Sequence, residues 1–283
     1  DLKNAEWIFF DMGFTLVDEG DEHRRRARIA IDEVASNGGE KITPEEFEKM
    51  AYEIGARGKA PFSRVCRRIG AHFVPYTGEL EKPYPCAGAV LDRLATKYKL
   101  GVIANQLPGA AERLARFGLD RHLAVIVSSA EFGAEKPDPS IFLAALEKAG
   151  CKPEGAVMVG DRPDNDIKPA RALGMMTVRV RQGQFRMYSP EGAEFEPDAD
   201  IADISELRVD RTQDICKGVR LVGAVEQRVI EAVKVFFAFF LMAEDLDDLL
   251  AVHHFLNVAV DFTKVALVLK KIFSDQTSFQ LYF

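Results

Sequence analysis

The amino-acid sequence predicts an α/β protein with a parallel-sheet core, a helical insert after the first strand and an additional C-terminal helical segment. The first observation is a run of four apolar residues, Trp7 to Phe10, which is typical of a strand buried on both faces of a parallel sheet. The second is a repeated alternation of helical and apolar strand patterns after Pro85. Such an alternation predicts parallel strands with helices on both faces of the sheet.

The first strand is expected over residues 5–11, and the later core elements follow in regular order. After Pro85 the patterns predict helices at 87–98, 108–117, 139–149 and 164–173. They predict strands at 99–104, 124–128, 156–160 and 175–180, with a last short strand near 199–202. The predicted α/β core therefore comprises residues 1–17 and 86–207.

Residues 18–85 form the predicted helical insert, because no convincing strand pattern occurs in this stretch. Asp21 stands where it could cap a first helix. A second helix start is clear at Thr43, because proline and two glutamates follow this N-cap threonine directly. A third helix is expected from about Pro61 to Phe73.

The character of the sequence changes again near Arg208. From there to Phe283 there is no proline and there are only two glycines, Gly218 and Gly223, so long helices are expected over 208–283. The densest apolar run is too short to span a bilayer. Its apolar side chains need burial. Three arrangements would bury them: packing on the core of the same chain, a separate helical subdomain, or a homodimer interface.

Composition narrows the classes of partner. The formal net charge is -7, which argues against nucleic-acid binding. The four cysteines are scattered without a CxxC pair, as is typical of reduced thiols in a cytoplasmic protein. No signal-peptide pattern precedes the first strand. We therefore expect a cytoplasmic protein that binds neither membranes nor nucleic acid.

Polar side chains that can carry chemistry stand near the ends of several predicted strands. Because the carboxyl ends of parallel strands meet at one edge of the sheet, these side chains should gather there. Taken singly, each is equally well explained as a helix cap, a loop acid or a surface lysine. Their arrival in order at the same edge favours a shared site. The residues are Asp11, Asn105, Lys136, Asp161 and Asp166.

This set of side chains indicates phosphoryl chemistry. Carboxylate oxygens are ligands that Mg²⁺ prefers, and a metal together with Lys136 could neutralise a phosphoryl group. Asp11 could then attack the group and form an aspartyl phosphate. Gly13 allows a sharp turn after the first strand, and Thr15 adds a hydroxyl.

The segment from Trp7 to about Leu207 resembles the haloacid dehalogenase-like (HAD) hydrolase superfamily. The resemblance rests on three stretches: IFFDMGFTLV at 8–17, Lys136 within EKPDPSIF at 135–142, and GDRPDND at 160–166. It implies a Rossmann-like core with a type 1 helical cap, formed by the insert, and Asp11 as the nucleophile. It also implies that Mg²⁺ is held by Asp11, the backbone carbonyl of Gly13 and Asp161, with Asp166 nearby.

Two positions depart from the family's phosphatases. Gly13 stands where they carry a second aspartate, the general acid/base, and Ala104 stands where they carry a hydroxyl residue. General acid–base catalysis typically contributes ~10²–10⁴-fold, so alkyl phosphates should be hydrolysed slowly. Asn105 could replace the missing hydroxyl as a hydrogen-bond donor to the substrate. Phosphonate hydrolases, dehalogenases and P-type pumps also lack the second aspartate. The dehalogenases use no metal, so the acid cluster favours the phosphoryl branch.

Two functions remain in competition. The first is a Mg²⁺-dependent HAD-like phosphatase of a small phosphorylated metabolite, with weakened acid–base catalysis. Here Thr15 and Asn105 bind substrate, and Arg64 or Arg67 of the insert reaches an anionic group, although a solvated helix face also explains these arginines. The second is a catalytically impaired HAD-like domain that binds a phosphorylated ligand or a protein partner through its C-terminal helices.

Overall fold

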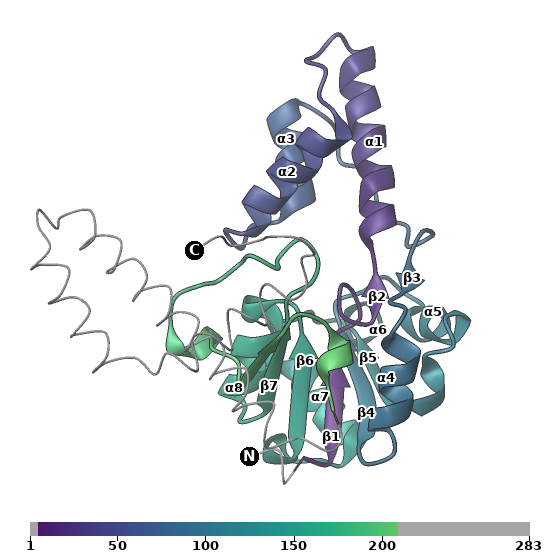
Figure 1. Ribbon diagram of the computed structural model, residues 1–283, viewed down its shortest axis with the longest axis vertical. Helices are drawn as coiled ribbons and strands as arrows, with labels where there is room; N and C mark the ends of the chain where they lie inside the picture. The colour runs from purple at the N-terminus through teal and green to yellow at the C-terminus, as the bar shows by residue number, and fades with distance from the viewer. Residues whose placement is uncertain (1–4, 209–283) are drawn as a thin grey trace, which may run out of the picture. The chain divides into compact units, whose positions relative to one another are not determined.

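The computed structural model describes residues 5–208, and these residues contain a six-stranded parallel sheet (Figure 1). The strand order is β5-β4-β1-β6-β7-β8, and every neighbouring pair is parallel. This arrangement confirms the predicted fold class. The strands are β1 (Trp7–Phe10), β4 (Lys99–Ala104), β5 (Leu123–Ser128), β6 (Ala156–Gly160), β7 (Met176–Val180) and β8 (Ala199–Ile201).

Helices cover both faces of this sheet because side chains of a strand alternate between its faces. Ile8 and Phe10 of β1 belong to one apolar cluster, together with residues of α4 (Ala87–Leu94) and α5 (Ala110–Arg116). Trp7 and Phe9 belong to a second cluster, with residues of α7 (Pro139–Ala149) and α8 (Lys168–Ala172). Strand β1 is therefore buried on both faces, as its unbroken apolar sequence predicts.

The insert folds as three helices with an apolar cluster of their own (Figure 1). These are α1 (Gly20–Ser36), α2 (Pro44–Gly55) and α3 (Pro61–Ile69). Helix α2 begins with a complete capping box, because the Thr43 hydroxyl accepts from Glu46 N and the Glu46 carboxylate accepts from Thr43 N.

A short antiparallel pair of strands joins the two ends of the insert, where the sequence suggested only helices. Strand β2 (Val17–Asp18) pairs with β3 (Lys82–Pro83). The expectation of no strand within residues 18–85 is therefore wrong at both ends. Two-residue strands are too short for an alternating pattern to reveal them.

Two predicted helices of the core are shorter or divided. The helix expected at 87–98 ends at Leu94. The helix expected at 164–173 is a π-helical turn (Pro163–Ile167) followed by the short α8. Pro169 lacks an N–H, so it supports a new helical start rather than a continuous α-helix.

The C-terminal helices and the homodimer interface predicted over 208–283 lie outside the described residues, apart from Arg208 itself. Within the described range, no helix has the length and apolarity needed to cross a bilayer. The remaining described elements are short: α6 (Ser129–Phe132) and four 3₁₀ turns at Asp120–His122, Pro153–Gly155, Ala193–Phe195 and Ile204–Glu206.

Candidate active site

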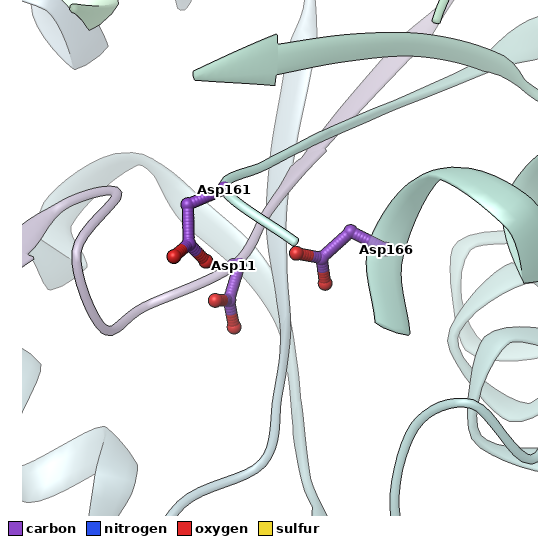
Figure 2. Close-up of side chains that lie close together, drawn as sticks. All are labelled: Asp11, Asp161 and Asp166. Atoms are coloured by element: carbon purple, nitrogen blue, oxygen red, sulfur yellow. The ribbon is translucent and has the colours of Figure 1, made fainter. Parts of the chain in front are cut away.

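Three carboxylates lie together at the carboxyl ends of β1 and β6 (Figure 2). The two strands are adjacent and pair Phe10 with Val159, so Asp11 and Asp161 leave the sheet at the same edge. Asp166 comes from the π-helical turn, and its Oδ2 accepts a hydrogen bond from Arg162 N at 2.9 Å. One oxygen from each carboxylate lies within 4.8 Å of the others.

Gly160 makes the close approach of Asp166 possible. A Cβ built on Gly160 would lie 2.7 Å from the Cβ of Asp166 and closer still to its carboxyl group. Any side chain at position 160 would therefore push Asp166 away from the other two carboxylates.

Lys136 joins two of the three carboxylates. Its Nζ donates to Asp11 Oδ1 at 2.7 Å and to Asp166 Oδ1 at 2.6 Å, and the residue is only 3% exposed. The Asn105 side chain holds the backbone of Lys136 at both ends: Asn105 Oδ1 accepts from Lys136 N at 2.7 Å, and Nδ2 donates to Lys136 O at 2.8 Å. The lysine is thereby fixed in position before any substrate arrives.

The charges of this cluster do not balance, since one ammonium faces three carboxylates. Burial raises the pKa of Asp11 to about 6, although Lys136 opposes this shift. Burial and the neighbouring Asp166 and Asp11 carboxylates raise the pKa of Asp161 well above its ordinary value. Burial alone would lower the pKa of Lys136, but its two carboxylate partners outweigh that effect and raise it.

A cation fits this cluster. Oδ2 of Asp161 is buried and has no hydrogen-bond partner among residues 5–208. Buried carboxylate oxygens are normally satisfied by a donor or a metal ion. Hard oxygen ligands from Asp11, Asp161 and Asp166 are those that suit Mg²⁺.

The cluster lines a cavity of about 360 Å³. Gly13, Asn105 and Lys136 share its wall with the three carboxylates, and aromatic rings from the loop after β1, from the insert and from the segment after β7 complete it. The rings are those of Phe14, Phe62, Phe73 and Phe185. A cavity of this size is typical of small-molecule sites.

The structure places the other predicted residues elsewhere. Thr15 is fully buried, its Oγ1 has no hydrogen-bond partner among the described residues, and it does not line the cavity. Arg64 and Arg67 are exposed on α3, also outside the described lining of the cavity. Their roles in substrate binding stay predictions.

Glu19 is a cavity residue that the sequence did not indicate. A Cβ built on Gly13 would lie 2.7 Å from Glu19 Cδ and 3.0 Å from Glu19 Oε2, and nearer still to Oε1. Gln106 Nε2 donates to Glu19 Oε1 at 2.9 Å. No sequence signal reveals this arrangement, because it depends on how the first residues of the insert fold back over the loop after β1.

Comparisons with known proteins identify relatives of this chain. A family model described as haloacid dehalogenase-like hydrolase matches residues 8–180. Glyceraldehyde 3-phosphate phosphatase of Methanopyrus kandleri is 33% identical over 229 residues, which are 74% of this chain and 98% of the relative. Phosphoglycolate phosphatase of Aquifex aeolicus is 28% identical over 193 residues, covering 64% and 87%. The crystal structure of a HAD phosphatase from Thermococcus onnurineus superposes with a TM-score of 0.52 at 25% identity, covering 71% and 95%.

Proposed function

The chain belongs to the haloacid dehalogenase-like hydrolase family, and we propose that it is a Mg²⁺-dependent phosphatase of a small phosphorylated compound. In this proposal the reaction passes through an aspartyl phosphate on Asp11. The observation that carries it is the Asp11 carboxylate, held by Lys136 inside a cavity that two more carboxylates share. The phosphatase names of the relatives support the same reaction class.

Magnesium would be held by the carboxylates of Asp11 and Asp161 and the backbone carbonyl of Gly13, with Asp166 nearby. The unpartnered oxygen of Asp161 and the excess of negative charge support this assignment. When bound, the ion would neutralise charge on the phosphoryl oxygens of the substrate.

The chain's own residues perform the remaining work. Lys136 donates a hydrogen bond to Oδ1 of Asp11, and this bond keeps the carboxylate oriented for attack on phosphorus. The positive charge of Lys136 also offsets negative charge on the phosphoryl oxygens. Asn105 fixes Lys136, and because an amide nitrogen carries two hydrogens, one remains for a phosphoryl oxygen. Aromatic side chains line the same cavity and give the non-reacting part of a substrate an apolar surface.

The competing proposal, a catalytically impaired binding domain, is favoured by Gly13 and by Ala104. The cost of the buried cluster argues against it. Asp11, Asp161 and Asp166 are buried or nearly so, and a buried charge is expensive unless it is paired or coordinates a metal. A domain without chemistry would gain stability by losing these carboxylates.

A phosphate-release assay with Mg²⁺ tests the proposed function. The substrates are glyceraldehyde 3-phosphate, phosphoglycolate, phosphoserine and p-nitrophenyl phosphate. We expect release from at least one of them and a loss of more than about 10³-fold in Asp11→Asn, since the nucleophile is gone.

Asp164→Asn is the matched control, because Asp164 lies in the same π-helical turn as Asp166 but pairs with Arg162 rather than with Lys136. This variant should retain the parent's activity within a few-fold. If no phosphate is released from any of the esters, or if Asp11→Asn is as active as the parent, the proposed function is wrong.

A further inference from the structure

Phosphate-ester hydrolysis through an aspartyl phosphate needs a proton donor for the leaving oxygen and a proton acceptor for the attacking water. Among the described residues that line the cavity, four are acidic: Asp11, Glu19, Asp161 and Asp166. Asp11 and Asp166 are ion-paired to Lys136, and Asp161 completes their cluster. Glu19 is the one acidic lining residue outside that cluster.

Glu19 fills the space that a side chain at position 13 would occupy. A Cβ built on Gly13 would meet Cδ and both carboxylate oxygens of Glu19 within 3.0 Å. Glu19, Gly13 and Asp11 all line the same cavity. The Glu19 carboxylate therefore occupies the space that a side chain at position 13 would need.

The Glu19 carboxylate is held over Gly13 by a hydrogen bond from Gln106 and does not cap helix α1. Glu19 is the N-cap residue of α1, yet its side chain makes no capping hydrogen bond. Gln106 Nε2 donates to Glu19 Oε1, while Gln106 Oε1 accepts from Arg113 at 2.7 Å, so the amide can point its nitrogen only toward Glu19. The Glu19 side chain is 12% exposed and lines the cavity.

We propose that Glu19 is the general acid/base of this site, a proposal that rests on the phosphatase function proposed above. As Asp11 forms a bond to phosphorus, the bond between phosphorus and the ester oxygen breaks, and that oxygen takes the proton of the Glu19 carboxyl group. The Glu19 carboxylate then takes a proton from water as the water oxygen bonds to phosphorus. The bond between phosphorus and Asp11 breaks, which restores both residues and releases phosphate.

His23 is the competing proton donor, because it also lines the cavity. Its Nε2 lies 3.8 Å from Glu19 Oε2, and its ring stacks on Phe14 at 5.5 Å between centroids. The two residues are separated by comparing Glu19→Gln with His23→Gln. Under the proposal, only Glu19→Gln shows the selective loss described next.

The test compares an ester that needs leaving-group protonation with one that does not. Glycerol 3-phosphate releases a poor leaving group, whereas p-nitrophenyl phosphate releases a stable anion. We expect Glu19→Gln to lower kcat/KM for glycerol 3-phosphate about 10²- to 10⁴-fold, with a much smaller loss for p-nitrophenyl phosphate. The exposed Glu147→Gln on α7 is the control and should match the parent on both esters.

Gly13→Ala provides a second variant that leaves Glu19 chemically intact. The added methyl group takes the space of the Glu19 carboxylate and should displace this flexible side chain, so the same selective loss is expected. Thermal unfolding of each variant verifies that it is folded.

An equal loss on both esters in Glu19→Gln, no loss on either, or the selective loss in His23→Gln instead would overturn the role of Glu19. A parent that hydrolyses only p-nitrophenyl phosphate would overturn it as well. In each of these cases the proposed function stands provided that Asp11→Asn is inactive. If the parent releases phosphate from neither of these esters nor from any substrate of the phosphate-release assay above, or if Asp11→Asn is active, the proposed function itself fails.

Discussion

Lys136 lies between two carboxylates in the interior, and its charge is what makes their burial tolerable. Removing one member of a buried ion pair leaves an uncompensated charge, which typically costs 3–5 kcal/mol, about the same order as the whole stability of many domains. The structure thus makes Lys136 important for stability as well as for the proposed reaction.

For Lys136→Met we expect the free energy of unfolding in urea to fall by about 3–5 kcal/mol in the absence of divalent cations. Added Mg²⁺ should recover part of this loss, because a cation can take the place of the ammonium among Asp11, Asp161 and Asp166. Lys148→Met, an exposed position on α7, is the control and should change stability by less than about 0.5 kcal/mol. Equal stability of the Lys136 variant and the parent would show that the buried pairs contribute nothing.

Among the elements, α2 depends on its N-terminal cap. Thr43 and Glu46 satisfy each other's backbone N–H groups, which would otherwise lack partners at the helix start. We expect Thr43→Ala to destabilise the protein by about 1 kcal/mol in urea unfolding. Thr43→Ser keeps the hydroxyl and should stay close to the parent. A Thr43→Ser variant as unstable as Thr43→Ala would point to the lost methyl group instead of the cap.

Helix α1 is tied to the segment that returns from the insert to the core. Glu22 in α1 accepts hydrogen bonds from Arg25 at 2.6 Å and from the backbone N–H and the hydroxyl of Thr77 at 3.0 and 3.1 Å. The hydrogen bond from Arg25 is the main reason that the pKa of Glu22 falls from 4.5 to about 2, and the bonds from Thr77 add to it. This carboxylate therefore links residues far apart in the chain.

Because the pKa of Glu22 is lowered by folding, its contribution to stability is present above pH 4.5 and is lost as the pH falls toward about 2. We expect Glu22→Gln to be less stable than the parent at pH 7 by up to roughly 3 kcal/mol. The difference should shrink when both are measured at pH 3.5. Chemical denaturation of both proteins across this range is the measurement. A difference that stays constant with pH would contradict the assignment.

In the described part of the molecule, the segment after β7 contacts both the core and the insert. Arg179 in β7 is buried, and its guanidinium donates to the carbonyls of Phe185 at 3.2 Å, Arg186 at 3.4 Å, and Tyr188. The guanidinium of Arg186 in turn lies 3.9 Å from the ring centroid of Tyr52 in α2. One buried arginine thus positions a segment that also supplies Phe185 to the cavity wall.

For Arg179→Met we expect trypsin to cleave after Arg186 at least tenfold faster than in the parent. Hydrogen bonds from a charged donor contribute about 1.5–3 kcal/mol each, and losing them favours local opening of the segment. Mass spectrometry of timed digests measures the rate at this bond. Arg171→Met, which removes an exposed partner of Asp198, should leave cleavage after Arg186 unchanged. Unaltered cleavage in the Arg179 variant would mean that other contacts hold the segment.

The amino-acid sequence was sufficient to predict the architecture and the edge of the sheet at which the polar residues meet. Unbroken apolar strands alternating with helices permit only a sheet covered on both faces, and the carboxyl ends of its parallel strands lie on one side. Asp11 and Asp161 each follow such a strand, so their proximity could be predicted without coordinates. The helix start at Thr43 was equally predictable, because the N-cap threonine, the proline and the two glutamates stand within four residues.

The folded structure was needed to show which side chain faces the space over Gly13, and where Thr15, Arg64 and Arg67 lie. Gln106, which follows β4, donates a hydrogen bond to Glu19 in this space, and β2 pairs with β3 just before the insert helix that Glu19 begins. Such contacts join residues far apart in the chain. Local patterns of polarity and propensity are set by near neighbours, so they carry no information about these long-range contacts.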